Sequence, residues 1–170
     1  MSVKTTKKVD ERDYYPSLLK RGISLIQNIN NGIEIKYALE LKQWIDCNRE
    51  FDILIAFKTP TRKEKRLLSI EVKKDSNAQT LFHQGLVRSQ LADYCYLAFP
   101  LQHLSYYWFK ATEYYIHYKK INKPFTFGLM TFDLITKKIF ILNYARQNKK
   151  LLNQTWKNKL FNAIMNGEEK

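Results

Sequence analysis

The stretch FDILIAFKTPTRKEKRLLSIEVKK, residues 51–74, decides how the fold is interpreted. It begins with a segment, 51–57, that is apolar except for Asp52, and it ends with mostly apolar residues around Glu71 and Lys73. Runs rich in β-branched and aromatic residues, bounded by polar turns, are typical of buried strands. The stretch therefore predicts two consecutive strands, joined by a basic connection, that carry three charged side chains.

Those three charges have a spacing that suits metal-assisted chemistry. Side chains two residues apart on a strand point to the same face, so Glu71 and Lys73 are expected side by side. If the strand of Asp52 is the neighbouring one, both carboxylates converge on one divalent cation. A hard cation such as Mg²⁺ takes oxygen ligands, usually one or two carboxylates completed by water and phosphate oxygens. It would polarise a phosphate and acidify a bound water, while Lys73 orients that water or stabilises developing charge.

The periodicity of the flanking sequence predicts the surrounding elements. Asp13 is expected to cap a helix that ends near Ile29, and strict alternation over 33–41 predicts a strand with one solvated face. A capping box at 76–79 begins a helix over about 77–92, and 94–99 is a short apolar strand. Beyond Pro100 we expect accessory elements, namely a helix over 104–120, a hairpin of 125–132 with 138–144, and a closing helix over 151–165.

With its Asp52 and Glu71-Val72-Lys73, this order of elements resembles the PD-(D/E)XK, restriction-endonuclease-like nucleases. That superfamily shares an αβββαβ core with an acid on the second strand and (D/E)-x-Lys on the third. The resemblance covers roughly residues 11–100 and implies an α/β fold with a mixed central sheet flanked by helices. It implies Mg²⁺, for which Mn²⁺ can substitute, held by Asp52, Glu71 and the Val72 carbonyl. Phe51 stands where the family name has proline, a position that varies among members.

The resemblance also singles out residues on two helices. Several members place a glutamine or a basic residue on the helix after the motif strand, which makes Gln84 a catalytic candidate. Arg88, one turn later on the same face, would reach the same phosphate. Gly85 lies between them and indicates close packing or a close approach of backbone. Some members carry a glutamate on the first helix, for which Glu11 is the weaker candidate, because a single acid near a terminus is more often solvated.

The charge of the chain points to a polyanionic partner. There are 29 Lys+Arg against 16 Asp+Glu, a net charge of +13. Nucleic acid is the first candidate, DNA before RNA, because neutralising phosphates releases condensed counterions. A membrane surface is not favoured, since the cations are spread over termini and loops instead of one helix face. The candidate phosphate contacts are Arg62, Lys63, Lys65, Arg66, Lys74 and Arg88, with Lys149, Lys150, Lys157 and Lys159 as further possibilities.

Other features define the class of protein more than its chemistry. Cys47 and Cys95 lack metal-like spacing, and Cys95 is interpreted as a small buried hydrophobe. The three histidines also lack metal-like spacing. The aromatic stripe over 107–118 has a helical period, which favours core packing over base stacking. Residues 1–10 have no apolar core of signal-peptide length, so an intracellular, cytoplasmic location is expected.

The sequence thus predicts a single domain, 1–170, that hydrolyses phosphodiester bonds of DNA. Two alternatives stay open: a non-catalytic nucleic-acid-binding protein on the same scaffold, and a protein-interaction module with a solubilising basic surface. The choices between endonuclease and exonuclease, between duplex, single-stranded and branched substrates, and between one and two metals are also open. A homodimer is compatible with the sequence.

Overall fold

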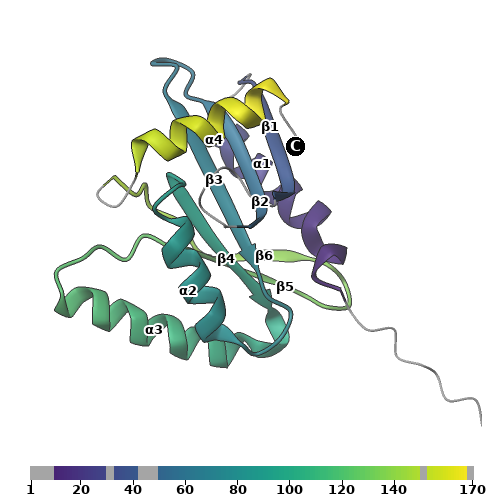
Figure 1. Ribbon diagram of the computed structural model, residues 1–170. Coiled ribbons are helices and arrows are strands. Elements are labelled where there is room, and N and C mark those ends of the chain that lie inside the picture. Colours follow the sequence, from purple (N-terminus) through teal and green to yellow (C-terminus); the bar gives the residue numbers. More distant parts are fainter. Residues whose placement is uncertain (1–9, 30–32, 42–49, 150–152, 168–170) are drawn as a thin grey trace, which may run out of the picture.

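The computed structural model describes residues 10–29, 33–41, 50–149 and 153–167. Six strands in this part of the chain form one mixed sheet in the order β1-β2-β3-β4-β5-β6 (Figure 1). The β1–β2, β2–β3 and β5–β6 pairs are antiparallel, whereas β3–β4 and β4–β5 are parallel. The elements are η1 (Glu11–Tyr14), α1 (Tyr15–Ile29), β1 (Ile35–Leu41), β2 (Phe51–Lys58), β3 (Lys65–Val72), α2 (Ala78–Arg88), β4 (Tyr94–Pro100), η2 (Leu101–His103), α3 (Leu104–Lys120), β5 (Gly128–Phe132), β6 (Ile139–Asn143) and α4 (Gln154–Asn166).

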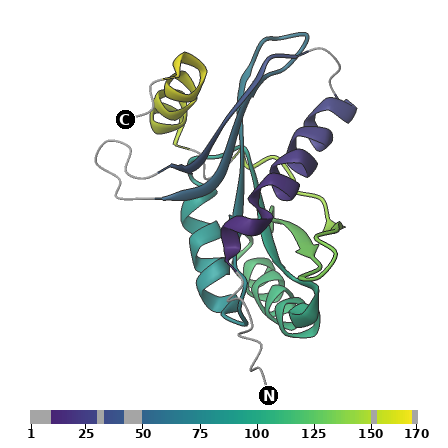
Figure 2. The same cartoon turned by 90° about the vertical axis from the view of Figure 1, so that its right-hand side faces the viewer.

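Helices cover both faces of the sheet, as Figure 2 shows for α1 on one side and α2 and α4 on the other. Alternation along β4 illustrates the division, because Tyr96 and Ala98 pack in the cluster beneath α1 whereas Leu97 and Phe99 pack beneath α2 and α3. A third cluster joins β1, β2 and β3 to α4. Burial on both faces explains why the central strands are almost continuously apolar.

The expected order of elements is confirmed, and most differences lie at the ends. Asp13 is not the helix cap, because Asp10 caps the short η1 that runs directly into α1. The helix expected to reach 92 ends at Arg88, where the N–H groups of Leu91 and Ala92 still bond back to its carbonyl in a closing turn. The hairpin and the closing helix are present, with bounds of Gly128–Asn143 and Gln154–Asn166.

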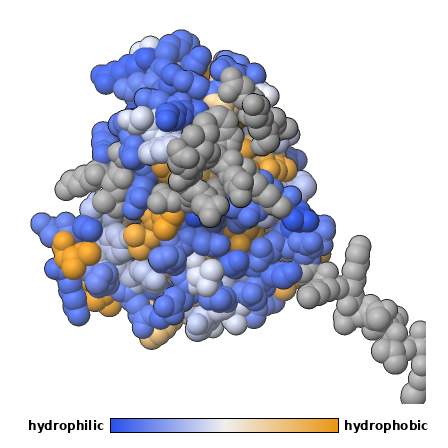
Figure 3. Space-filling model, viewed as in Figure 1, coloured by the Kyte–Doolittle hydropathy of each residue, from blue (hydrophilic) through white to orange (hydrophobic). Residues whose placement is uncertain are grey.

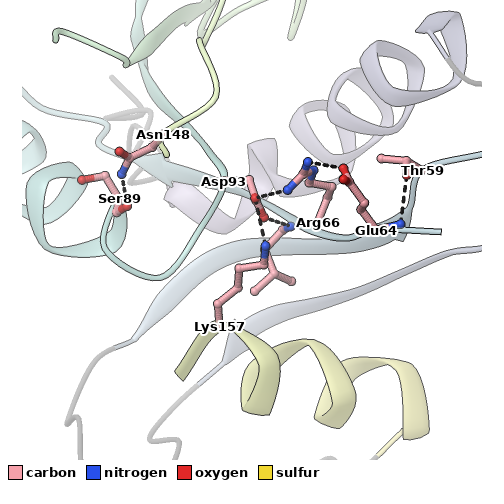
Figure 4. A network of polar contacts seen from close by, with 8 residues as sticks. Thr59, Glu64, Arg66, Ser89, Asp93, Asn148 and Lys157 are labelled. Carbon is pink, nitrogen blue, oxygen red and sulfur yellow. Dashed lines mark hydrogen bonds and ion pairs between the residues drawn. The ribbon is translucent and has the colours of Figure 1, made fainter. Parts of the chain in front are cut away.

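A buried ion-pair network fastens α4 to the sheet (Figure 4). Asp93 is fully buried, and its carboxylate accepts from Lys157 Nζ at 3.0 Å, Arg66 Nη1 at 3.1 Å and the Leu67 N–H at 2.8 Å. Arg66 also pairs with Glu64. Lys157 is buried and Arg66 is partly buried, and both pair with this one buried carboxylate, so these side chains serve the packing of β3, β4 and α4. Lys157 is therefore not the free phosphate contact that its charge indicated.

Within the described residues, no helix combines the length and the apolarity needed to cross a membrane.

Candidate active site

The expected neighbourhood of Asp52 and Glu71 is confirmed. β2 and β3 pair from Lys58↔Lys65 to Ile53↔Ile70, and continuing that register places Asp52 opposite Glu71. At this point the Val72 N–H donates to Asp52 Oδ2 at 2.7 Å, so a carboxylate takes the place of a backbone acceptor. Both side chains belong to the sheet face that carries α2 and α4, since they alternate in phase with Leu54 and Leu67 of the α4 cluster.

Asp52 is held by two donors. The Tyr15 hydroxyl, from the first turn of α1, donates to Asp52 Oδ1 at 3.0 Å, while Val72 donates to the other oxygen. Burial raises the pKa of Asp52, and the two hydrogen bonds and the charge of Lys73 oppose that rise. Asp52 is thus a partly buried carboxylate whose ionised form is stabilised by fixed donors.

Glu71 is the more buried of the two acids, with 1% of its surface exposed. Its Oε2 lies 3.7 Å from Arg88 Nε, and its Oε1 has no hydrogen-bond partner among the described residues. Burial, and then the charge of Asp52, raise the pKa of Glu71 well above its ordinary value, while Arg88 and Lys73 oppose the rise. Two interacting carboxylates with an unpartnered buried oxygen are an arrangement that a cation would stabilise.

Lys73 follows directly on the end of β3, and its N–H donates to the Ala98 carbonyl at 3.0 Å. It is partly exposed and close enough to lower the pKa of both Asp52 and Glu71. The N–H and C=O of one strand residue point to the same side, so the Val72 carbonyl is expected on the side where its N–H meets Asp52. The sequence-predicted residues are thus brought together by the β2–β3 pair.

Arg88 does not lie on the surface as a free phosphate contact. It is 9% exposed and bridges Glu71 to the start of β2, where its guanidinium donates to the Glu50 carbonyl and lies 5.5 Å from the centroid of the Phe51 ring. The position where the family name has proline thus supplies an aromatic ring for this arginine. Gln84 is partly buried, and its Oε1 has no partner among the described residues.

Glu11 lies nearer to the site than the sequence indicated. Its Oε1 accepts from the Lys74 N–H at 3.1 Å, just beyond the end of β3, and its charge contributes to the raised pKa of Asp52. Tyr15 is the residue that sequence reasoning missed, because one tyrosine in an amphipathic helix carries no signal of its partner. Both residues reach the site because η1 passes the end of the sheet where Asp52 lies.

The basic residues of the β2–β3 connection lie away from these acids. β2 and β3 are antiparallel, so the turn at 59–64 is at the opposite end of the pair from Glu71. Six residues of strand separate Lys65 from Glu71, a distance of about 20 Å. Arg62 and Lys63 are exposed, whereas Arg66 is occupied by Glu64 and Asp93, and Lys65 Nζ donates to Asn162 Oδ1. Of this cluster, Arg62 and Lys63 keep the exposure that a phosphate contact needs.

The remaining sequence predictions have different outcomes. Cys95 is buried, as expected, and burial raises the pKa of its thiol to about 12. Three further predictions lie outside the described residues, namely Cys47, Lys150 and the expected turn at 46–50, of which only Glu50 is described. Tyr107 and Tyr118 of the aromatic stripe pack in the core, whereas Trp108 and Tyr115 are about half exposed. Packing therefore explains only part of that stripe.

The residues present fit a hard divalent cation with few protein ligands. Asp52 and Glu71 offer carboxylate oxygens, and one oxygen of Glu71 is buried without a partner. Among the described residues, no group of three or more His, Cys, Asp and Glu side chains is placed to hold a metal ion. Mg²⁺ commonly binds through one or two carboxylates with several waters, so a pair of acids suffices.

Comparison with known proteins shows the fold at a coarse level. No protein-family model and no curated protein sequence matches the chain. Among solved structures, it is similar to the SPO1766 protein of unknown function from Silicibacter pomeroyi, with a TM-score of 0.54 and 11% identity. That similarity covers 95% of this chain and 88% of the other. The chain is thus an α/β protein with a six-stranded mixed sheet flanked by helices, an architecture shared at low sequence identity.

Proposed function

We propose that this chain is a Mg²⁺-dependent nuclease of the PD-(D/E)XK, restriction-endonuclease-like type that hydrolyses phosphodiester bonds of DNA. The observation that carries the proposal is the hydrogen bond of 2.7 Å from the Val72 N–H to Asp52, beside Glu71. This hydrogen bond brings the acid of β2 next to the Glu-x-Lys segment of β3, and metal-assisted hydrolysis requires the two carboxylates to lie close together. The order of η1 and α1, β1 to β3, α2 and β4 supports the same proposal.

Each residue has a distinct task in this proposal. Asp52, Glu71 and the Val72 carbonyl would hold the cation, which would supply charge stabilisation at the phosphate and an acidified water. Lys73 would orient the attacking water or neutralise charge that develops on the phosphate oxygens. Tyr15 holds Asp52 in position through its hydroxyl, and Arg88 holds Glu71.

A second candidate, a non-catalytic nucleic-acid-binding protein on the same scaffold, is favoured by one observation. Glu71 is 1% exposed and already paired with Arg88, so a cation would have to compete with an existing partner. The net charge of +13 supports binding to nucleic acid in either case. This candidate predicts salt-dependent binding that is indifferent to divalent metal, without cleavage.

Cleavage assays separate the two candidates. The full chain is incubated with end-labelled single-stranded, duplex and branched DNA and with RNA, in Mg²⁺, in Mn²⁺ and in EDTA. We expect cleavage of DNA that requires the metal and falls at least a hundredfold in Asp52→Asn, Glu71→Gln and Lys73→Ala, because each removes a group that acts on the phosphate or its metal.

Two matched variants control for purity and folding. Glu113→Gln removes an acid from a surface ion pair of α3, and Lys138→Ala removes a lysine from an exposed position before β6. Both should cleave at the wild-type rate. Metal-dependent cleavage that persists in Asp52→Asn or Glu71→Gln would reveal a contaminating nuclease or a different site, and absence of cleavage from every substrate would favour the binding protein.

A further inference from the structure

A groove lies between α3 and the last two strands of the sheet, away from the acids just described. Its volume is about 380 Å³, within the range of small-molecule sites. Three of its lining residues are aromatic, and Thr112, Asn143 and Arg146 contribute polar side chains. The full lining is Trp108, Ala111, Thr112, Tyr115, Phe125, Leu129, Leu142, Asn143 and Arg146.

The shape of the groove follows from the spacing along α3. Trp108 and Tyr115 are seven residues apart, two helical turns on one face, so their rings lie roughly 10 Å apart along the axis. Ala111 and Thr112 lie between them, and their small side chains line the bottom of the groove. The tryptophan is 51% exposed and the tyrosine 53%, which leaves a large part of both side chains outside the core. These are flat, accessible surfaces against which a planar ring can stack.

The charges around the groove select an anionic ligand. The lining contains one cation, Arg146, and no acid, and the Arg146 side chain is exposed. Glu113 is the one acid on α3, and it is paired with Lys110. The last turn of the same helix carries His117, Lys119 and Lys120.

Asn143 adds a hydrogen-bonding group to this environment. Its Nδ2 donates to the Phe127 carbonyl at 3.1 Å, which fixes the amide and leaves its oxygen as an acceptor at the groove. Aromatic faces, a guanidinium and an amide oxygen match the ring, the phosphate and the amino groups of a nucleotide.

We infer that this groove binds unpaired bases of a single-stranded nucleic acid, which stack on Trp108 and Tyr115 while Arg146 contacts a phosphate. This inference rests on the proposed function, because the groove would bind a single-stranded part of the substrate of the proposed nuclease. Strand register places the two sites on one face of the sheet: Glu71 pairs with Leu97, which pairs with Leu129 of the groove. Two strand spacings amount to about 10 Å between the backbones, and α2 packs against β3, β4 and α3.

The surface around α3 is otherwise mixed. In the face shown in Figure 3, hydrophobic residues form small separate groups among hydrophilic ones. Phe109, the neighbour of Trp108, is 63% exposed but is not part of the groove lining. It therefore provides a control of the same residue class on the same helix.

The test measures binding in EDTA, so that no cleavage intervenes. Fluorescence anisotropy follows a labelled single-stranded oligonucleotide and an abasic oligonucleotide of the same length, titrated with wild type, Trp108→Ala, Trp108→Phe and Phe109→Ala. We expect Trp108→Ala to weaken binding of the intact oligonucleotide about tenfold or more, since loss of one stacking ring has that effect. Trp108→Phe should retain most of the affinity, and Phe109→Ala should bind as wild type. The abasic oligonucleotide should bind wild type and Trp108→Ala equally.

Three results would overturn the inference. Wild-type affinity of Trp108→Ala for the intact oligonucleotide would exclude stacking in the groove. An equal loss for both oligonucleotides would assign the effect to the backbone or to misfolding. A change of self-association on size-exclusion chromatography, with oligonucleotide binding unaltered, would assign the groove to a second copy of the chain. Because Asp52 and Glu71 are intact in these variants, failure here leaves metal-dependent cleavage untouched, and failure of cleavage leaves base stacking untouched.

Discussion

One partly buried carboxylate, Asp52, and one fully buried carboxylate, Glu71, define the site at the scale of single residues, and they differ in how they are supported. Asp52 accepts from Tyr15 and from Val72, whereas Glu71 has one oxygen near Arg88 and the other without a partner among the described residues. The pKa of each is raised by burial. When no metal is bound, ionisation of Glu71 therefore destabilises the folded protein more than ionisation of Asp52 does.

This cost predicts a pH-dependent effect of Glu71→Gln on stability. The pKa of Glu71 is higher in the folded protein than in the unfolded chain, where it is near 4.5. The contribution of Glu71 to folding stability is therefore fully present below pH 4.5, and it is lost as the pH rises toward the folded-state pKa. In EDTA at neutral pH we expect the neutral amide to raise the melting temperature by a few degrees, and the difference to vanish below about pH 4. Thermal melts from pH 4 to 8 measure it. A variant that is less stable than wild type at pH 8 would contradict the assigned burial of charge.

Tyr15→Phe tests the support of Asp52. The hydroxyl stabilises the carboxylate, so its removal should raise the pKa of Asp52 and shift the acidic limb of metal-dependent cleavage to higher pH. The loss of stability should be about 1 kcal/mol. Tyr14→Phe is the matched control, because the Tyr14 hydroxyl donates to the Leu134 carbonyl away from Asp52. Identical pH profiles for both variants would mean that Tyr15 does not position Asp52.

At the scale of elements, the packing of α2 against β4 depends on a glycine. A Cβ on Gly85 would lie 2.5 Å from Leu97 Cδ2 and 3.3 Å from Phe127 Cε1, which are both in the buried cluster beneath α2 and α3. Of the two expectations for Gly85, close packing and a close approach of backbone, the first is confirmed, since the atoms nearest to this Cβ belong to side chains. The helix thus lies close enough to the sheet for Arg88 to reach Glu71.

Gly85→Ala should therefore destabilise the protein although alanine favours helices. Overpacking typically costs about 1–3 kcal/mol, which exceeds the gain in helix propensity of roughly 1 kcal/mol. His83→Ala, at an exposed position of the same helix, supplies the control and should change stability by less than about 0.5 kcal/mol. Urea denaturation gives both values. A Gly85→Ala protein more stable than wild type would show that the helix moves away from β4 without cost.

Much of the arrangement of elements was predictable from the sequence, but the contacts among them were not. Alternation and helical period located β2, β3, α2 and the later hairpin, because burial of one or both faces imposes those periods. The pairing of Asp52 with Val72 needed strand register. Arg88 was expected to contact a phosphate because its charge, seen alone, indicates an accessible side chain, but it is buried beside Glu71. The burial of Lys157 beside Asp93 could not be read locally either, since those partners are 64 residues apart.

At the scale of the whole molecule, cations are divided between structural and exposed roles. Arg66, Arg88 and Lys157 are paired with buried acids, whereas Arg62 and Lys63 remain exposed in the β2–β3 turn. That turn lies about 20 Å from Glu71 along the strands. A nucleic acid that spans both would contact the turn by its phosphates, far from the bond being cut.

Neutralising the turn should therefore affect binding and not the chemical step. Arg62→Gln combined with Lys63→Asn removes both charges, and asparagine tolerates the left-handed backbone of position 63, where φ is 53°. The slope of log affinity against log salt should decrease in magnitude by about 1–2, and the cleavage rate of saturated enzyme should stay at the wild-type value. An unchanged salt slope would remove the turn from the binding surface.

The central claim is that Asp52 and Glu71 together hold a divalent cation, and calorimetric titration of the full chain with Mn²⁺ tests it most directly. Wild type and Glu113→Gln should bind Mn²⁺ alike, while Asp52→Asn and Glu71→Gln should each lose that binding, because a site with two carboxylates loses half of its charged ligands in either variant. Undiminished Mn²⁺ binding by Asp52→Asn or Glu71→Gln, or no binding by the wild type, would contradict the account.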